Sequence, residues 1–431
     1  MMVDALPPDW EVKKIRELHA GGVTNLTPTE YSNEHFEYYS IPAYQEGILP
    51  PIVRGKEILS QKLLIPSRCL LFGKLNPRVE KVWNVESSGR VRCLASTEWL
   101  PIVPADEFDQ HFGYYLLWSN WVLPVAQGLV SGSTPSRQRV EPTSFYDIEV
   151  PLPPIDEQRE IGALLKRFQA AVSAQDDVVK AAQNLKRAAM RELFTRGLGS
   201  EAQKETEIGL VPESWDIAAL DDCSFVQTGA AKGRSLGDAE IVEMPYLRVA
   251  NVQDGRLDLT EMKTIPIRRG EVERYRLHDG DVVLTEGGDF DKLGRGFIWR
   301  GQVDQCVHQN HIFAVRTDRG RLLPEFFAYQ AQSPYGKAYF LKVAHKTTNL
   351  ACINSTKLKA FPVLLPPLGD QREVVGILDA IDQTINLHRT KRAVLDDLFK
   401  ALLHKLMTGE IRVGDLDPSA LTLTRVAEAA Q

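Results

Sequence analysis

The sequence predicts an α/β protein in which two pseudo-symmetric α/β domains are separated by a long antiparallel two-helix coiled coil. Three observations carry this prediction. A proline-led segment occurs twice in the chain, each copy opens a long helical pattern, and short strand-like runs precede each copy. The repeat sets the expected boundaries: domains at residues 1–152 and 200–365, helices at 153–199 and 366–412, and a tail at 413–431.

The repeat is explicit in the residues. Pro-Pro-Ile-Asp-Glu-Gln-Arg-Glu starts at Pro153, and Pro-Pro-Leu-Gly-Asp-Gln-Arg-Glu starts at Pro366. We call the separation between these two prolines the repeat spacing. It is too long for the unit of a solenoid and fits one domain plus one helix. The chain is therefore expected to consist of two equivalent halves.

Each domain is expected to begin at a turn that buries a tryptophan, because Pro7–Trp10 and Pro212–Trp215 share a Pro-x-x-Trp pattern. Strand-like apolar runs follow, and helical stretches come after them near residues 107–120 and 324–342. The combination predicts two mixed α/β domains. The runs lie at residues 63–65, 69–72, 99–103, 281–284 and 311–315.

The repeat spacing continues through the predicted strands, where Leu70-Leu71 match Val283-Leu284 and Trp99-Leu100 match Ile312-Phe313. The loops between the matched strands have unrelated residues. Residues 73–78 read Gly-Lys-Leu-Asn-Pro-Arg, and residues 286–295 read Glu-Gly-Gly-Asp-Phe-Asp-Lys-Leu-Gly-Arg. We therefore expect one backbone frame that presents two different polar surfaces.

Both helices carry apolar residues at alternating steps of four and three, which is typical of the seam of a coiled coil. They follow prolines and are expected to end near Gly197 and Gly409. An antiparallel pair lets each domain lie at the start of its own helix while the first helix leads into the second domain. The seam positions of the first helix are Ile161, Leu165, Phe168, Val172, Gln175, Val179, Ala182, Lys186, Ala189 and Leu193, and the repeat spacing gives their counterparts in the second, from Val374 to Leu406.

Four seam positions are polar or charged: Gln175, Lys186, His388 and Arg392. In one interpretation they are buried and specify a single pairing of the two helices, at some cost in stability. In the other they lie near water at the margin of the seam. Neither interpretation implies catalysis.

The composition is that of an ordinary soluble chain, with 431 residues, a net charge of −6 and a pI near 5.9. A protein that binds DNA tightly by itself usually has a basic surface, so the acidic balance favours one that gains affinity from partners. No run of 18 apolar residues and no apolar leader occurs, which predicts a cytoplasmic protein. The five cysteines are scattered singly, so we expect buried reduced thiols and no structural zinc.

The two Pro-Pro…Gln-Arg segments, the twinned helices and the stretches Tyr246–Val252 and His308–His311 resemble the specificity subunit of type I restriction-modification systems. The likeness extends over nearly the whole chain to about Val413. The combination of motifs is specific, although no single motif is. Residues 414–431 fall outside the resemblance and are expected to form a frayed tail.

The resemblance implies a non-catalytic protein with two target recognition domains, each of which reads one half of an asymmetric bipartite site in double-stranded DNA. The paired helices would set the gap and dock two modification (methyltransferase) subunits, which bring S-adenosylmethionine. A restriction subunit, where present, adds cleavage that uses ATP and magnesium. This chain itself is expected to bind no cofactor, and the repeated Gln158, Arg159, Gln371 and Arg372 are expected to contact partners.

Side chains that read base edges are Arg or Lys for guanine and Asn or Gln for adenine, while others bind phosphate. Polar residues of the divergent loops are therefore the candidates for DNA contact, with plain surface solvation as the alternative at each position. In the first domain they are Lys74, Asn76, Arg78, Ser133, Ser136, Arg137 and Arg139. In the second they are Lys232, Arg234, Asp289, Lys292, Arg295, His308, Gln309, His311, Lys346, Thr347 and Asn349.

Other functions are less well supported by the residues. Asp9, Glu11 and Lys13 resemble a nuclease pattern, but they are too close in sequence to lie on two strands. His308 and His311 have the spacing of a metal ligand pair, although polar readout fits them better. The alternatives are a self-sufficient restriction or methyltransferase enzyme, a coiled-coil scaffold with protein-binding end domains, or a specificity subunit of a related multi-subunit system.

Overall fold

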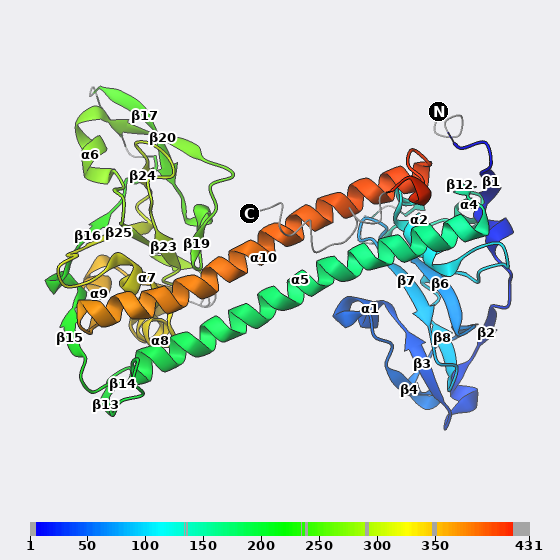
Figure 1. Cartoon of the computed structure of the whole chain (residues 1–431), viewed down its shortest axis with the longest axis horizontal. Helices are drawn as coiled ribbons and strands as arrows, with labels where there is room; N and C mark the ends of the chain where they lie inside the picture. Colours follow the sequence, from blue (N-terminus) through cyan, green and yellow to red (C-terminus); the bar gives the residue numbers. More distant parts are fainter. Residues whose placement is uncertain are drawn as a thin grey trace. The chain divides into compact units, whose positions relative to one another are not determined.

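A computed structural model describes residues 6–416, apart from residues 133, 135, 136, 234, 238, 239, 289–292 and 347–350 (Figure 1). The chain divides into two compact units, which are described separately. Unit 1 comprises Met1–Asp177 and Arg389–Gln431, and unit 2 comprises Val178–His388. Each unit therefore contains one globular domain and part of each long helix.

The domain of unit 1 is a mixed α/β structure with two main sheets. One sheet has the order β7-β6-β9, and the other has the order β2-β5-β8-β3-β4. The strands of these sheets are β2 (Thr24–Leu26), β3 (His35–Tyr39), β4 (Ile52–Arg54), β5 (Lys62–Ile65), β6 (Arg68–Gly73), β7 (Val82–Glu86), β8 (Arg92–Ala95) and β9 (Trp99–Ile102). The short helices are α1 (Ile41–Gly47), α2 (Gln110–Trp118), α3 (Leu123–Gly128) and α4 (Pro142–Tyr146), and two further strand pairs join β1 (Glu11–Lys14) to β12 (Glu149–Leu152) and β10 (Val130–Ser131) to β11 (Arg139–Val140).

The domain of unit 2 is built on the same plan. Its main sheet has the order β16-β25-β21-β23, and two three-stranded sheets have the orders β20-β17-β24 and β22-β27-β26. These strands are β16 (Ser224–Thr228), β17 (Ile241–Leu247), β20 (Lys263–Arg268), β21 (Val282–Thr285), β22 (Gly287–Gly288), β23 (Gly296–Ile298), β24 (Val307–His308), β25 (Ile312–Thr317), β26 (His345–Lys346) and β27 (Ala351–Cys352). The remaining elements are β13 (Gln203–Thr206), β14 (Gly209–Pro212), β15 (Asp216–Ala219), β18 (Val252–Gln253), β19 (Arg256–Leu257), β28 (Pro362–Leu365), α6 (Val272–Tyr275), α7 (Pro324–Gln332), α8 (Pro334–Val343) and α9 (Ser355–Lys359).

The predicted tryptophan turns are confirmed in both domains. The N–H of Trp10 donates to the carbonyl of Pro7 at 3.0 Å, and that of Trp215 donates to the carbonyl of Pro212 at 3.3 Å. Both indole rings are buried. The strand that follows each turn pairs with the strand before the long helix, β1 with β12 and β15 with β28, so the start of each domain is fixed next to its end.

The predicted match of Leu70-Leu71 to Val283-Leu284 is wrong by one position. Leu70 pairs with Ile102, and Val282 pairs with Val315 in the equivalent strands. Leu70 and Val282 both face the large core of their unit, whereas Leu71 and Val283 face smaller clusters. A slip of one position exchanges the two faces of a strand, so the structure makes Val282 the counterpart of Leu70.

The two predicted long helices are present as α5 (Ile155–Arg196) and α10 (Leu368–Thr408), drawn in green and orange in Figure 1. Gly197 and Gly409 follow them with φ angles of +64° and +71°. This left-handed conformation is the usual way for a glycine to end a helix. Among the described residues, no helix is long and apolar enough to cross a membrane.

Within unit 1, α5 and α10 run antiparallel and share one core. Glu157 near the start of α5 pairs with Arg412 just after α10, whereas Asp176 pairs with Arg392 within α10. As residue numbers rise along α5, the numbers of their partners fall. The shared core includes Ile161, Leu165 and Phe168 from α5 and Leu402 and Leu406 from α10.

Within unit 2, the helices are joined by an ion pair on the seam. Both carboxylate oxygens of Asp382 lie 2.7 Å from the Nζ of Lys186, and these side chains are 22% and 13% exposed. The hydroxyl of Tyr329 in α7 donates to Asp379 at 2.6 Å and to Asp382 at 2.8 Å. Lys186 is thus a largely buried seam residue, while Arg392, with 43% of its side chain exposed, lies at the margin.

The equivalent place in unit 1 has different chemistry. The repeat spacing relates Lys186 to Phe399 and Gln169 to Asp382. In unit 1 the hydroxyl of Tyr115 donates to Gln169 at 2.8 Å, and its ring lies 6.0 Å from that of Phe399. The positions of the Lys186–Asp382 ion pair in unit 2 are therefore occupied in unit 1 by the uncharged residues Phe399 and Gln169.

The C-terminal segment is partly folded, so the predicted tail beginning at residue 414 starts too early. Val413 and Leu416 pack against the core of unit 1. The guanidinium of Arg412 binds Asp9 at 2.9 and 2.6 Å and also binds Glu157. Residues 417–431 lie outside the described part of the chain.

Four of the five cysteines are buried, as predicted, but Cys352 is exposed on β27. The prediction was wrong at this position because a short strand at the domain surface leaves its outward side chains in water. All five cysteines lie in the described part of the chain, and none forms a disulfide.

Replacing Asp382 by alanine should destabilise unit 2 by about 2–3 kcal/mol, somewhat below the roughly 3–5 kcal/mol of a fully buried broken pair, because Lys186 retains some contact with water. The double variant Lys186→Phe with Asp382→Gln installs the residues of unit 1 and should recover most of this loss. Urea unfolding of the full chain measures both. Additive losses in the double variant would show that the two side chains do not act as a pair.

Candidate nucleic-acid interface

The predicted site residues of unit 1 are brought together where β6 ends. The N–H of Lys74 donates to the carbonyl of Glu98 at 3.0 Å, and the carbonyl of Lys74 accepts from Val140 at 2.9 Å. The N–H of Asn76 donates to the carbonyl of Gln138 at 2.8 Å. These bonds hold the loop that contains Lys74, Asn76 and Arg78 against the β10–β11 segment that contains Arg137 and Arg139.

A buried lysine, Lys81, binds the backbone of this loop. Lys81 is only 4% exposed, and its ammonium donates to the carbonyls of Asn76, at 3.2 Å, and Val79. Burial lowers the pKa of Lys81, and the two carbonyls satisfy its charged form. Asn76 adopts a left-handed φ of +47°, a conformation that asparagine tolerates better than most residues. The loop is therefore held in one shape by its own backbone.

Arg139 is oriented by an acidic partner. Its Nε lies 3.2 and 3.1 Å from the two carboxylate oxygens of Glu98, and one terminal nitrogen lies 3.0 Å from Oε1. The other terminal nitrogen donates to the carbonyl of Arg137 at 3.3 Å. The guanidinium is 46% exposed, so it is fixed in orientation and still faces water.

The same junction exists in unit 2, where β21 ends. The N–H of Glu286 donates to the carbonyl of His311 at 2.9 Å, and the carbonyl of Glu286 accepts from Ile353 at 2.9 Å. The Nδ1 of His311 lies 2.6 Å from a carboxylate oxygen of Glu286, and both side chains are partly exposed. Gly287 and Gly288 then pair with Cys352 and Ala351 in β27.

Further predicted residues of unit 2 surround this junction. The loop that carries Lys232 is tied to it, because the carbonyl of Ala230 accepts from Asn310 at 3.0 Å. The carbonyl of Arg295 accepts from Thr285, the last residue of β21, and its guanidinium donates to Gln253 at 3.2 Å. Lys232, Arg295, Gln309 and His311 therefore cluster at one end of the main sheet, and their contact with DNA stays a prediction.

Several predicted residues lie wholly or partly outside the described part of the chain. Lys346 lies on β26, but its side chain is outside the described part of the chain. The others outside it are Ser133, Ser136, Arg234, Asp289, Lys292, Thr347 and Asn349.

The prediction that His308 contacts DNA is wrong, because its side chain is fully buried. Its Nδ1 lies 2.9 Å from the carbonyl of Tyr275, and burial lowers the pKa of its imidazole. His308 belongs to β24 and is buried there, whereas the side chain of His311 reaches the surface. The two histidines point to different environments and do not form a metal ligand pair.

The prediction that Gln158 and Gln371 contact partners is also wrong, because both are fully buried. The Oε1 of Gln158 accepts from Asp109 at 2.9 Å, and its Nε2 donates to the carbonyls of Glu107 and Pro153 at 2.9 and 2.8 Å. Gln371 makes the matching three bonds, to Leu323, Arg321 and Pro366, each at 2.9 Å. Each glutamine fastens a domain to the start of its helix, while Arg159 and Arg372 are exposed.

The residues of the nuclease-like pattern have structural roles. Asp9 binds Arg412, which lowers the pKa of its carboxyl group. Lys13 pairs with Glu107 at 2.8 Å. In the described part of the chain, no group of three or more His, Cys, Asp or Glu side chains is arranged to hold a metal ion.

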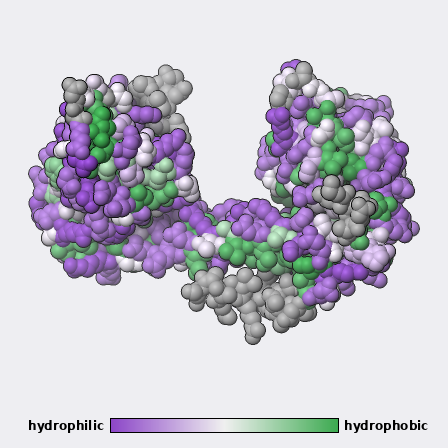
Figure 2. Space-filling model, turned by 90° about the horizontal axis from the view of Figure 1, so that it is seen from above, coloured by the Kyte–Doolittle hydropathy of each residue, from purple (hydrophilic) through white to green (hydrophobic). Residues whose placement is uncertain are grey.

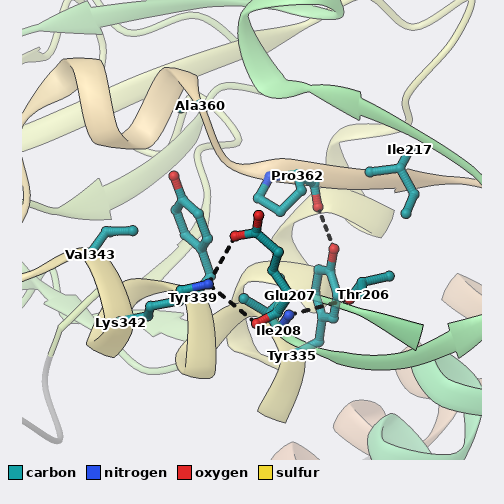
Figure 3. Close-up of a pocket in the computed structure, with 10 residues that line it drawn as sticks. All are labelled: Thr206, Glu207, Ile208, Ile217, Tyr335, Tyr339, Lys342, Val343, Ala360 and Pro362. Atoms are coloured by element: carbon teal, nitrogen blue, oxygen red, sulfur yellow. Dashed lines mark hydrogen bonds and ion pairs between the residues drawn. The ribbon is translucent and has the colours of Figure 1, made fainter.

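Unit 2 also contains an apolar pocket of about 340 Å³ between the β13–β14 hairpin and α8 (Figure 3). The hydroxyl of Tyr335 donates to the carbonyl of Pro362 at 2.9 Å, and Lys342 pairs with Glu207 at 2.9 Å at its edge. Burial raises the pKa of Tyr335. These groups satisfy one another, and the pocket lies apart from the junction of β21 and β25.

The comparisons with known proteins match this architecture. Residues 212–397 match the family model described as the type I restriction modification DNA specificity domain. This part of the chain, from the start of the domain of unit 2 into α10, is therefore similar to the DNA specificity domain of type I restriction-modification systems. The family model covers the domain of unit 2 and most of α10, and unit 1 repeats the same fold.

Two relatives come from Methanocaldococcus jannaschii. The type I restriction enzyme MjaVIII specificity subunit is 22% identical over 96% of this chain and 95% of its own length. The putative MjaX specificity subunit is 26% identical over 48% of each chain, so this chain spans about half of that relative. A chain from a solved type I R-M system structure covers 94% of this chain and 99% of its own length with a TM-score of 0.59 and 20% identity, which supports the fold.

The sequence did not single out Glu98 and Lys81, which orient Arg139 and the Asn76 loop, or Glu286, whose carboxylate contacts His311. The predicted set was drawn mainly from polar donors expected at the surface, whereas Glu98 and Glu286 are carboxylates and Lys81 is buried. The repeat spacing gave one signal, since it relates Glu98 to His311, directly before β9 and β25.

The variant Gln371→Ala should destabilise unit 2 by on the order of 3–5 kcal/mol, because one buried N–H and two carbonyls lose their partner. The matched control Arg372→Ala, at the next position along the helix, should change stability by less than about 0.5 kcal/mol. Thermal and urea unfolding of the full chain measure both. Equal stabilities of the two variants would mean that the buried bonds of Gln371 do not stabilise unit 2, as expected for a residue at the surface.

The buried His308 should make unit 2 less stable as the pH falls. Its folded pKa lies below the ordinary value of 6.5, so below pH 6.5 the unfolded chain takes up a proton that the folded chain excludes. The loss is about 1.4 kcal/mol per pH unit between 6.5 and the lowered value. His308→Gln should reduce this slope, measured by urea unfolding at pH 7 and pH 5.

The exposed His345 supplies the control, because His345→Gln should leave the pH dependence as in the wild type. A His308→Gln slope equal to that of the wild type would mean that His308 takes up a proton in the folded chain.

Proposed function

We propose that this chain is the DNA sequence-specificity subunit of a type I restriction-modification complex and that each domain reads one half of an asymmetric bipartite site. The observation that carries the proposal is the repeated junction at the ends of β6 and β21. One backbone frame there presents Lys74, Glu98 and Arg139 in unit 1 and Glu286, His311 and Cys352 in unit 2. Different side chains on one frame suit two different half-sites.

The paired helices would set the gap between the half-sites. A helix of 42 residues, such as α5, spans about 63 Å, which exceeds the roughly 34–36 Å of one DNA turn. The two helices pair with each other within unit 1, through Asp176 and Arg392, and within unit 2, through Lys186 and Asp382. A stiff pair of this length would act as a ruler.

Partner subunits would dock along these helices. The helices carry large apolar side chains with at least a third of their surface in water, and Figure 2 shows hydrophobic residues there. Two modification subunits that bring S-adenosylmethionine are the proposed partners, and a restriction subunit would add ATP and magnesium. This chain would be non-catalytic. The exposed apolar residues are Val178 and Leu185 of α5 and Ile377, Leu387 and Val394 of α10.

Inserting one heptad after Asp177 and one after His388 should lengthen the gap and leave both half-sites unchanged. Seven residues add about 10.5 Å, or roughly three base pairs at 3.4 Å each. Methylation sequencing of cells that express the chain with its modification subunits should show an asymmetric split site and its longer form. A palindromic site, or a variant with an unchanged gap and new bases, would contradict the proposal.

A further inference from the structure

The two junctions share two equivalent backbone hydrogen bonds. The bond from Lys74 to Glu98 matches the bond from Glu286 to His311, at 3.0 and 2.9 Å. The bond from Val140 to Lys74 matches the bond from Ile353 to Glu286, both at 2.9 Å. The bonds equate Lys74 with Glu286, Glu98 with His311, and Val140 with Ile353. The residues just before the last two, Arg139 and Cys352, pair with the residues that follow Lys74 and Glu286. We call Lys74, Glu98 and Arg139, and their counterparts Glu286, His311 and Cys352, the three-position set.

The strand pairing supports the same correspondence. Gly73 is the partner of Trp99, and Thr285 is the partner of Ile312. The following residue in each strand is therefore Lys74 or Glu286. The separation between Lys74 and Glu286 is one position shorter than the repeat spacing, in agreement with the corrected register of β6.

The charges of the side chains in the set differ between the two units. The set of unit 1 contains two cations, Lys74 and Arg139, and its carboxylate, Glu98, is occupied by Arg139. The set of unit 2 contains no permanent cation, and its carboxylate, Glu286, lies at the Lys74 position beside His311. Unit 1 therefore offers hydrogen-bond donors where unit 2 offers acceptors.

The guanidinium of Arg139 is prepared for a base edge. It has five N–H donors, of which Glu98 and the carbonyl of Arg137 take three. In the described part of the chain, one N–H on each terminal nitrogen is left without a hydrogen bond. The N–H groups that remain can donate to the O6 and N7 acceptors of guanine in the major groove.

Glu286 fits the opposite kind of base edge. A carboxylate accepts hydrogen bonds and donates none, so it matches the N4 amino group of cytosine. It is 30% exposed, and its contact with the imidazole of His311 fixes its orientation as Glu98 fixes that of Arg139. Each set thus has one reader and one side chain that positions it.

We infer that the three-position set is the specificity-determining element of each domain, that Arg139 reads a guanine in one half-site, and that Glu286 reads a cytosine in the other. This inference rests on the proposed function. Glu98 and His311 are positioning residues, which act through Arg139 and Glu286.

The test is selection of duplexes from a random-sequence library by the full chain in complex with its modification subunits, at a stated low salt concentration. The wild type should select two unlike half-sites, one with a guanine and one with a cytosine at a fixed position. Arg139→Gln should lose the guanine preference by roughly 5- to 150-fold and leave the other half-site unchanged. Glu286→Lys, which installs the residue of unit 1, should lose only the cytosine preference.

Two variants separate positioning from folding. Glu98→Gln should weaken the guanine preference, while Arg139→Lys should retain part of it, since lysine keeps a donor but loses the fork. Matched controls are Arg90→Gln and Glu205→Lys, at exposed positions outside the sets, which should leave every base preference unchanged. Circular dichroism of each variant confirms that it is folded.

The outcomes separate the inference from the proposed function. If the wild type selects no sequence, the proposed function fails. If it selects a split site and folded Arg139→Gln and Glu286→Lys keep both base preferences, the inference is overturned and the proposed function stands. Loss of preference in both half-sites from a single variant would also overturn the inference.

Discussion

Two backbone hydrogen bonds at the end of one strand hold the proposed recognition surface of each unit in place. In unit 1 they tie Lys74 to Glu98 and Val140, and in unit 2 they tie Glu286 to His311 and Ile353. Because only backbone atoms take part, the side chains at these positions are not needed for the fold. Such a frame can hold a cation in one copy and a carboxylate in the other without changing its shape.

The same division between frame and side chain appears at the helices. Each domain is fastened to the start of its helix by a buried glutamine with three hydrogen bonds, and these bonds are equivalent in the two units. The seam differs between the two units. Lys186 and Asp382 form an ion pair in unit 2, whereas the equivalent residues of unit 1, Phe399 and Gln169, are uncharged. A charged seam pair has its partner in only one arrangement of the helices, so it favours that arrangement over others.

The sequence predicted the helices, their ends and the two α/β domains, because heptad spacing, prolines and glycines are local signals. It misplaced Gln158 and Gln371, since a repeated polar residue has the same pattern whether it binds a partner or a buried backbone. It placed β6 one position out of register, because the differing loop lengths leave no mark in the strands themselves. The pairs Glu98–Arg139 and Glu286–His311 are separated by 41 and 25 residues, and only the folded chain brings them together.

The most direct test of the account is where each junction lies on DNA. Cys352 is the exposed cysteine among the five and lies on the junction of unit 2, so an iron chelate attached to its thiol would cleave nearby DNA. The variant Cys352→Ser with Arg137→Cys moves the chelate to the junction of unit 1. On the selected site, the account predicts cleavage in one half-site for the first protein and in the other for the second. Cleavage by both in the same half-site, or by neither, would contradict it.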